Sequence, residues 1–395
     1  MSSVVPDGWS EEYVGEHFDF SIGGTPSRNN KLYWDADKET SNIWLSIRDL
    51  NGKFISNSAE RISNLGVSKS NVKLLPEGTV LMSFKLSIGR LSISTTPLYT
   101  NEAIVGFIEK RSNTVDRDYL YFGLQYWDIL GEVDQAVKGA TLNKDKMSRI
   151  LGLFPPLPEQ KKIASILTSV DEVIENTQKQ IDKLQDLKKA TMNELLTKGI
   201  GHTEFKDSEL GRIPKSWEVS SLGECFNLTS GKSKPKRLLS SVKTQLNKVP
   251  VYGGNGVTGY TDSELLDEKT IVIGRVGEYC GCVHLTPKLC WITDNALYIK
   301  SITRVFDLSF MFHLMVFSDL AQLQSKGGQP LVSQKPISEF VIALPPIVEQ
   351  QKIASFIDAI SSNIDNQSVK LSQTQSLKKS VMQDLLTGKV RVSVN

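Results

Sequence analysis

The phrase "PEQKKIAS" at residues 158–165 recurs as "VEQQKIAS" at residues 348–355, which is 190 residues further along the chain. The likeness extends beyond these letters. A Pro-Pro pair precedes both copies, and Leu-Lys-Lys and Leu-Leu-Thr triplets follow both at matching distances. Repetition at a fixed spacing indicates an internally duplicated architecture. We therefore expect one structural element to occur twice in this chain.

A second, weaker repeat precedes each copy of this phrase. "VPDGWSEEYVGEHFDFSIGG" (5–24) aligns with "IPKSWEVSSLGECFNLTSGK" (213–232) at an offset of 208 residues. The offset then changes from 208 to 190, so the first variable stretch is 18 residues longer than the second. We interpret the chain as a tandem duplication, in which each half is a variable block followed by a more similar tail.

The two tails have the pattern of long helices. Seam positions, most of them apolar, recur alternately three and four residues apart from Leu167 to Leu195 and from Ile357 to Leu385. This spacing is typical of a coiled coil, here with polar interruptions. A partly apolar seam suits a helix that packs on a partner, so we expect the tails to pack on each other. The alternatives are that each tail packs on its own block or forms a homodimer.

The ends of these helices are also marked in the sequence. Neither tail contains a proline or glycine between 159 and 198 or between 349 and 387. Each begins after its Pro-Pro pair with a Glu-Gln pair, which suits the first turn of a helix. Gly199 and Gly388 stand where such helices would end. Antiparallel packing would put the two variable blocks at opposite ends of the helix pair.

The variable blocks have a strand-and-turn texture. Short runs rich in Val, Ile, Thr, Tyr and Phe, such as "TVLMSF" (79–84) and "TIVIGRVG" (270–277), alternate with Gly, Asn, Asp and Pro. Residues 115–130 and 308–324 predict one helix near the end of each block. We assign the α+β class, with two mostly-β blocks at 1–155 and 201–345, a central helix at 156–200 and a C-terminal helix at 346–395.

Composition narrows the class of protein. A chain of 395 residues predicts two to four domains, and 39% hydrophobic with 23% charged residues is ordinary for a soluble globular protein. All four cysteines lie in the second half without the spacing of small secreted proteins, which favours a reducing cytoplasm. We see no signal pattern and no stretch long enough to span a membrane. The net charge of +2 leaves room for local basic patches only.

One such basic patch lies between Ser230 and Pro250, where six basic residues occur without an acidic one. Such a run can neutralise phosphates, although a solvated surface loop is the alternative. The matching loop of the first half is "TPSRNNKLYW" (25–34), whose polar side chains suit phosphate or base-edge hydrogen bonds. In that loop, Tyr33 and Trp34 are interpreted as packing residues. The glycines of "YGGNG" (252–256) suit either a phosphate or a hairpin turn.

The candidate DNA contacts share a polar or basic side chain in a loop of a variable block. They are Thr25, Ser27, Arg28, Asn29, Asn30, Arg48, Arg90, Lys138, Lys144, Lys232, Lys234, Lys236, Arg237, Asn255, Arg275 and Gln329.

The motifs together resemble the specificity subunit of type I restriction–modification systems. The resemblance rests on "GGTPSRNNKLYW" and "IWLSIRDLNG" in the first half and on "VPVYGGNGVTGY", "TIVIGRVGEYCGCVH" and "TDNALYIK" in the second. In both halves a glycine-containing turn also leads to a Pro-Pro segment, a Glu-Gln pair and a long helix. The likeness covers nearly the whole chain and includes its twofold internal order.

This resemblance implies a non-catalytic reader of double-stranded DNA. Each block would be a target recognition domain for one half of a bipartite, asymmetric site, and the helices would be a fixed spacer. Two methyltransferase subunits, which use S-adenosylmethionine, would dock on the spacer, and restriction subunits would join them. Glu159, Gln160 and Lys162 would begin the helix and contact a methyltransferase subunit rather than bases. The alternative is a coiled-coil adaptor that does not read DNA.

Enzymatic and metal motifs fail on their spacing. "SGKS" (230–233) lacks the glycine that a phosphate-binding loop requires at position 226, which is Phe226. "FPPL" and "LPPI" lack the flanking residues of the adenine-methyltransferase tetrapeptide. Cys280, Cys282, His284 and Cys290 do not have a usual zinc spacing, so reduced core cysteines are the favoured interpretation over a metal site.

Overall fold

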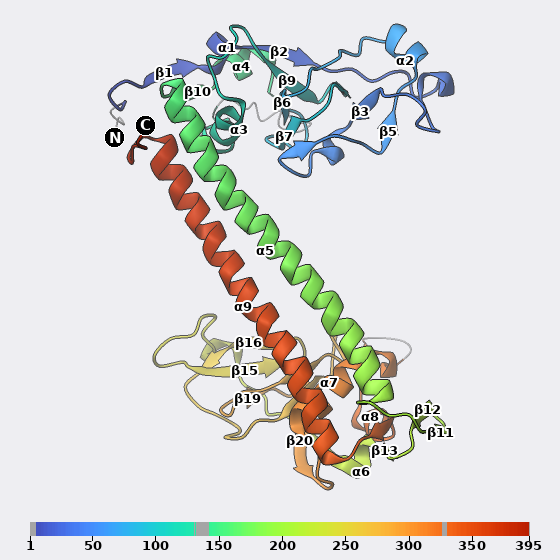
Figure 1. The fold of residues 1–395 in the computed structure, drawn as a ribbon. Coiled ribbons are helices and arrows are strands. Elements are labelled where there is room, and N and C mark those ends of the chain that lie inside the picture. Colours follow the sequence, from blue (N-terminus) through green and yellow to red (C-terminus); the bar gives the residue numbers. More distant parts are fainter. Residues whose placement is uncertain (1–4, 130, 132–141, 326–329, 395) are drawn as a thin grey trace. The chain divides into compact units, whose positions relative to one another are not determined.

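The protein forms two compact units that share two long helices. The structure, a computed structural model, describes residues 5–129, 131, 142–325 and 330–394. Unit 1 comprises Met1–Thr177 with Lys370–Asn395, and unit 2 comprises Gln178–Val369. Each unit therefore contains one variable block, one half of helix α5 (Leu157–Lys198) and the opposite half of helix α9 (Ile347–Leu386) (Figure 1).

Unit 1 is built on three sheets. The largest has the strand order β2-β9-β6-β7-β4 and is antiparallel except for the β4–β7 pair; the second has the order β5-β3-β8, and β1 pairs with β10. The strands are β1 Ser10–Tyr13, β2 Phe18–Ile22, β3 Ile43–Leu45, β4 Phe54–Ile55, β5 Glu60–Arg61, β6 Val80–Ser83, β7 Leu91–Ser94, β8 Tyr99–Thr100, β9 Ile104–Glu109 and β10 Leu151–Phe154. The short helices are α1 Val14–His17, η1 Lys31–Tyr33, η2 Ile47–Asp49, α2 Asn64–Ser68, α3 Arg117–Tyr126 and α4 Lys144–Ser148.

Unit 2 repeats most of this topology with other residues, but its largest sheet has four strands and, among the described residues, no counterpart of β4. Its sheets have the orders β14-β20-β17-β18 and β16-β15-β19, β13 pairs with β21, and β11 and β12 add a separate hairpin. The strands are β11 Phe205–Ser208, β12 Gly211–Pro214, β13 Glu218–Ser221, β14 Phe226–Ser230, β15 Val249–Gly253, β16 Gly256–Thr261, β17 Ile271–Gly274, β18 Val283–Leu285, β19 Trp291–Ile292, β20 Ala296–Ile302 and β21 Val341–Leu344. The short helices are α6 Leu222–Cys225, η3 Lys236–Leu238, α7 Leu308–Phe317, η4 Leu320–Leu323 and α8 Gln334–Ser338.

The two three-stranded sheets correspond strand by strand. In each, the central strand pairs antiparallel with one neighbour and parallel with the other: β3 with β5 and β8, and β15 with β16 and β19. The duplication seen in the sequence is thus a duplication of topology, and the α+β class is confirmed. The strand runs predicted from residues 79–84 and 270–277 are confirmed as β6 and β17.

The helices at the ends of the blocks are shorter than the sequence pattern suggests. Helix α3 begins after the N-cap Asp116, whose side chain accepts from the Tyr119 amide, and ends before Trp127. In unit 2 the apolar pattern extends to residue 324, but α7 ends at Phe317 and a 3₁₀ turn follows. Asp319 between them has a left-handed backbone with φ of 47°, which interrupts the hydrogen-bond ladder.

The seam of the long helices is confirmed by burial. The repeating positions of α5 from Leu167 to Leu195 and of α9 from Ile357 to Leu385 are buried or half-buried, and most residues between them are exposed. Within unit 1, Lys378 of α9 pairs with Asp171 of α5 at 2.6 Å. In both units, residues of both helices also join the core of the block. Each tail therefore packs on the other tail and on a block, antiparallel within each unit.

The repeated Glu-Gln pair joins helix and block. Glu159 and Gln160 are only 3% and 2% exposed, so the expectation that these two residues contact a partner subunit is wrong. Lys162 is exposed, and its contact with a partner subunit stays a prediction. Glu159 accepts the Trp9 indole N–H at 3.0 Å, and Glu349 accepts that of Trp217 at 3.1 Å. The glutamines instead accept the backbone amides of Asp116 and Asp307, at 2.8 and 2.9 Å, where α3 and α7 begin. The pair recurs because both of its members join the start of a long helix to its block.

Candidate nucleic-acid interface

The polar loop of each block is held close to a parallel strand pair. A Cβ on Gly23 would lie 2.0 Å from the Thr100 carbonyl oxygen, and a Cβ on Gly231 would lie 2.3 Å from that of Ile292. Neither position tolerates a side chain, which explains the glycine in both loops. The next residue donates its amide to the same carbonyl in both units, Gly24 to Thr100 at 2.8 Å and Lys232 to Ile292 at 2.9 Å.

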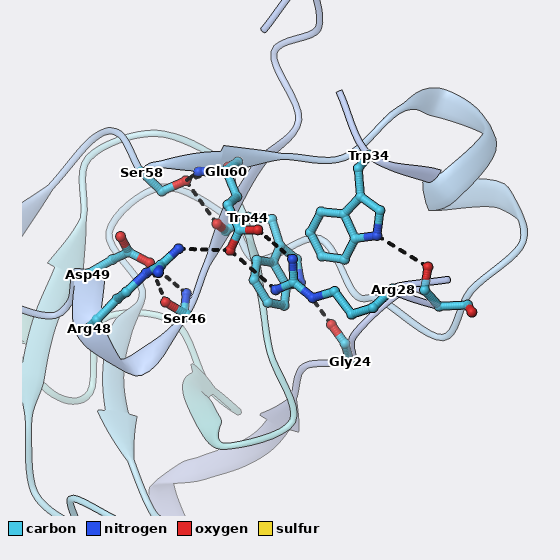
Figure 2. A network of polar contacts seen from close by, with 10 residues as sticks. Gly24, Arg28, Trp34, Trp44, Ser46, Arg48, Asp49, Ser58 and Glu60 are labelled. Carbon is cyan, nitrogen blue, oxygen red and sulfur yellow. Dashed lines mark hydrogen bonds and ion pairs between the residues drawn. The ribbon is translucent and has the colours of Figure 1, made fainter. Parts of the chain in front are cut away.

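In unit 1 this loop presents Arg28 on an aromatic platform (Figure 2). The guanidinium carbon lies 3.7 Å from the ring centroid of Trp34 and 4.8 Å from that of Trp44. The two indoles meet edge to face with centroids 5.0 Å apart. Their N–H groups donate to the loop itself, Trp34 to the Ser27 carbonyl at 3.2 Å and Trp44 to the Gly24 carbonyl at 2.9 Å. The packing role expected for Trp34 is confirmed, and it supports the cation directly.

A single carboxylate orients two arginines at this site. Glu60 on β5 accepts from both terminal nitrogens of Arg28, and from Arg48 Nη2 at 3.1 Å (Figure 2). Arg48 belongs to η2, which is closed by a reciprocal capping box between Ser46 and Asp49. The Arg28 and Arg48 side chains remain 51% and 66% exposed. Two planar donors are therefore held in fixed planes at the surface, where they can bind a guanine edge or a phosphate.

Unit 2 has a lysine at the corresponding place. Lys234 Nζ lies 3.8 Å from the Trp291 ring centroid and donates to Ser263 Oγ at 2.7 Å. The Trp291 indole donates to the Lys232 carbonyl at 2.9 Å, as Trp44 does to Gly24 in unit 1. Both units thus carry a cation on an indole that is anchored to the glycine loop. The indole comes from different strands, because Trp44 lies on β3 whereas Trp291 lies on β19, the counterpart of β8.

Arg275 directly follows β17, and Asn255 lies in the turn between β15 and β16. Arg275 Nη1 donates to Ser230 Oγ at 3.3 Å, at the start of the loop that carries Lys232 and Lys234. Asn255 is exposed at the tip of the β15–β16 hairpin, where Gly256 has φ of +82°. The hairpin interpretation of "YGGNG" is therefore confirmed. His284 lies against Gly256, and burial lowers the pKa of its imidazole.

The remaining predicted contacts have varied surroundings. Thr25 donates to Glu102, and this hydrogen bond holds the pKa of the Glu102 carboxyl below its ordinary value, with Lys85 and Arg28 contributing. Asn30 caps η1 by accepting the Leu32 amide. The exposed members are Ser27, Asn29, Arg90, Lys144, Lys232, Lys236 and Arg237.

Not all candidates lie in one cluster. Among the described residues, no hydrogen bond or ion pair links Arg90 or Lys144 to the Arg28 cluster. Lys138 and Gln329 lie outside the described residues. Whether any candidate contacts DNA stays a prediction.

The sequence reasoning missed Glu60, Trp44 and Trp291. Glu60 lies 32 positions after Arg28 in a short strand, and no local pattern connects the two. Trp291 and Trp44 are not aligned in the repeat, because they arrive from different strands. The signal that could have indicated these aromatic partners is a tryptophan in a strand of each block.

The cysteines of unit 2 are free thiols. Cys225, Cys280 and Cys290 are buried, and Cys282 is half-buried. Burial raises the pKa of the Cys225 and Cys290 thiols, which keeps them protonated. Across the described ranges, no three His, Cys, Asp or Glu side chains meet in a way that could hold a metal ion. In the same ranges, no helix is long and apolar enough to cross a membrane.

Comparison with known proteins identifies the family. The family model described as "Type I restriction modification DNA specificity domain" matches residues 6–186 and again residues 214–374. The chain belongs to the type I restriction–modification specificity family. The two matches coincide with the two halves of the duplication, so each half of this specificity chain is one family domain.

Relatives and solved structures agree with this membership. The chain is 34% identical over 306 residues to a putative type I restriction enzyme specificity subunit, MjaX, of Methanocaldococcus jannaschii, covering 72% of this chain and 71% of the relative. It is 25% identical to the MjaVIII specificity subunit of the same organism, covering 98% and 94%. The fold matches the crystal structure of a type I S subunit from M. genitalium with a TM-score of 0.67 at 15% identity, covering 98% and 97%.

Proposed function

We propose that this specificity chain reads a bipartite, asymmetric site in double-stranded DNA, with each block acting as a target recognition domain for one half-site. The observation that carries this proposal is the cation on an indole at the same glycine loop in both units. One unit offers a planar arginine and the other a lysine, which have different hydrogen-bonding geometry. Two half-sites of different sequence follow from that difference.

The chain supplies recognition, and partner subunits supply chemistry. Family membership supports an assembly in the cytoplasm with two methyltransferase subunits, which bind S-adenosylmethionine, and with restriction subunits in a larger complex. A duplicated surface beside the helices fits two equal docking sites. In unit 2 a cleft of about 700 Å³ is lined by Lys188, Lys189 and Met192 of α5 and by Phe317 of α7. Unit 1 has the matching side chains Lys378, Lys379 and Met382 of α9 and the half-exposed Tyr126 of α3.

The test is to co-express the chain with a methyltransferase subunit and to map methylated adenines by long-read sequencing. With the native chain, the co-expressed methyltransferase subunit should methylate one bipartite motif. Arg28→Lys keeps the charge but loses the planar fork, so it should relax one base position of one half-site. A bidentate arginine–guanine pair discriminates by about 1–3 kcal/mol, or roughly five- to 150-fold. Lys234→Gln should affect only the other half-site.

Arg111→Lys is the matched control, because Arg111 is exposed in the same unit but lies outside the loop. It should leave the motif unchanged. An adaptor that does not read DNA would produce no motif-dependent methylation. Loss of discrimination at the same half-site in the Arg28 and Lys234 variants would contradict the assignment of one half-site to each block.

A further inference from the structure

A basic cleft lies on the three-stranded sheet of unit 2. It has a volume of about 580 Å³, and Lys243, Lys248, Lys288 and Tyr260 line it together with Val249, Pro250, Pro287 and Leu289. The cleft lies where β15 and β19 begin and β16 ends. Its lysines come from two segments about forty residues apart in the sequence, and only the fold brings them together.

The charges of this cleft are uncompensated. Within the part of the chain that the structure describes, no acidic residue lines it. Lys243, Lys248 and Lys288 are all exposed, and none forms an ion pair with another described residue. Like charges gathered on a concave surface repel each other and focus a positive potential, which a bound polyanion would relieve.

Segments that line the cleft are neighbours in sequence of those that carry the candidate interface of the same unit. Trp291, on which Lys234 lies, is the first residue of β19, and Cys290 alone separates it from Lys288 and Leu289. Lys234 also donates to Ser263, just after the end of β16. Tyr260 exchanges backbone hydrogen bonds with Ser240, which holds the basic 230–250 segment across this end of the sheet.

The corresponding place in unit 1 has a different charge pattern. Trp34 bridges to Ile62 there, as Ser240 bridges to Tyr260 in unit 2. The unit 1 cleft has a volume of about 370 Å³ and includes Arg28, Lys31 and Arg61 but also Asp35 and Glu60. In unit 1 the Glu60 carboxylate pairs with arginines, whereas the charged side chains that line the unit 2 cleft are all lysines.

We infer that the Lys243–Lys248–Lys288 cleft binds the phosphate backbone of double-stranded DNA, and that unit 2 therefore carries more of the salt-dependent affinity than unit 1. This inference rests on the proposed DNA-reading function and adds a division of labour to it. Contacts to phosphate are independent of base sequence, so the cleft strengthens binding to every duplex.

The inference is tested by the salt dependence of binding. The full chain is titrated with a fluorescein-labelled duplex of random sequence at several NaCl concentrations, and log K is plotted against log[NaCl]. Each phosphate neutralised contributes about 0.9 to the slope, so the triple variant Lys243→Gln, Lys248→Gln, Lys288→Gln should lower its magnitude by up to about 2.7. The corresponding triple Lys→Arg variant should retain the native slope, and thermal unfolding of both variants checks that they fold.

The matched control removes the same charge elsewhere in unit 2. Lys206, Lys335 and Lys352 are exposed and do not line the cleft, so their triple Gln variant should retain the native slope. If the native chain binds with a salt-dependent affinity and the cleft variant has the same slope, the cleft assignment is overturned alone. If the cleft variant instead loses co-purification with a methyltransferase subunit at an unchanged DNA slope, the cleft is a protein interface. A native chain without salt-dependent binding would overturn the proposed function as well.

Discussion

At the scale of single residues, the repeated glutamate is the clearest link between sequence and structure. Glu159 and Glu349 both accept a tryptophan N–H, but their basic partners differ. Arg391, beyond the end of α9, forms two 2.8 Å hydrogen bonds to Glu159. Burial alone would raise the pKa of the Glu159 carboxyl, but the bonds from Arg391 and Trp9 hold it below its ordinary value. The Glu159 carboxylate therefore stays ionised in the folded unit 1.

His313 gives a pH-dependent prediction for unit 2. The buried imidazole lies 2.7 Å from Asp358, with Asp307 and Lys188 also acting on it, and burial lowers its pKa overall. Below pH of about 6.5 the unfolded chain binds a proton that the folded unit does not, so stability should fall as pH drops through this range. The measurement is the free energy of unfolding, obtained from urea titrations between pH 7.5 and pH 5.5.

A non-titrating variant separates this histidine from the others. In His313→Gln the loss of stability on acidification should be smaller than in the native chain, while part of it remains because burial also lowers the pKa of His284. An equal loss in the native chain and in the variant would assign the effect to other groups.

At the scale of elements, the helix pair is specified by periodicity and weakened by polar seam residues. Thr177 is buried in the seam, but its hydroxyl donates to the Val173 carbonyl at 2.7 Å. Gln367 is different, because its buried Oε1 has no partner among the described residues. A buried acceptor without a donor costs about 1–3 kcal/mol, so this seam is less stable than an apolar one.

Replacing Gln367 therefore tests the seam. Gln367→Leu removes the unpaired oxygen and adds an apolar seam residue, and it should raise the free energy of unfolding by about 1 kcal/mol. The measurement is the urea midpoint of the full chain. Gln375→Leu, at an exposed position of the same helix, is the control and should give no comparable gain. A destabilised Gln367→Leu variant would mean that the amide has a role that the seam geometry does not reveal.

At the scale of the whole molecule, the chain runs through unit 1, unit 2 and unit 1 again. Both described ends belong to unit 1, where Val5 and Val392 pack on one core. Only α5 and α9 pass between the units. The helices are therefore the elements whose length can be changed without altering either candidate interface.

Lengthening both helices predicts a change in DNA spacing. A heptad inserted into α5 between Lys179 and Leu184, with a matching heptad in α9 between Val369 and Leu371, adds about 10 Å of helix. The gap between half-sites should lengthen by up to about three base pairs, at about 3.4 Å each, while the half-site sequences stay the same. Methylated-adenine mapping measures both properties.

Exchange of residues 1–150 for another family block is the complementary variant. It should change one half-site and leave the gap as it was. New half-site sequences in the heptad variant would show that the helices do more than set a spacing.

The sequence alone determined the duplication, the α+β class, and the extent and seam of the two long helices. These features are encoded by local periodicity, by Gly199 and Gly388 at the helix ends, and by the spacing of one repeated phrase. It also located the glycine loops that carry Arg28 and Lys234, because composition marks an exposed basic loop.

Only the tertiary structure decided how those loops are organised. It brought Glu60 to Arg28 and Arg48, placed Trp44 and Trp291 under the loops from non-equivalent strands, and gathered Lys243, Lys248 and Lys288 into one cleft. These contacts join residues from tens of positions apart, through short strands whose pairing leaves no periodic trace in the sequence. Helix periodicity is a local property of the chain, whereas a binding surface depends on long-range pairing.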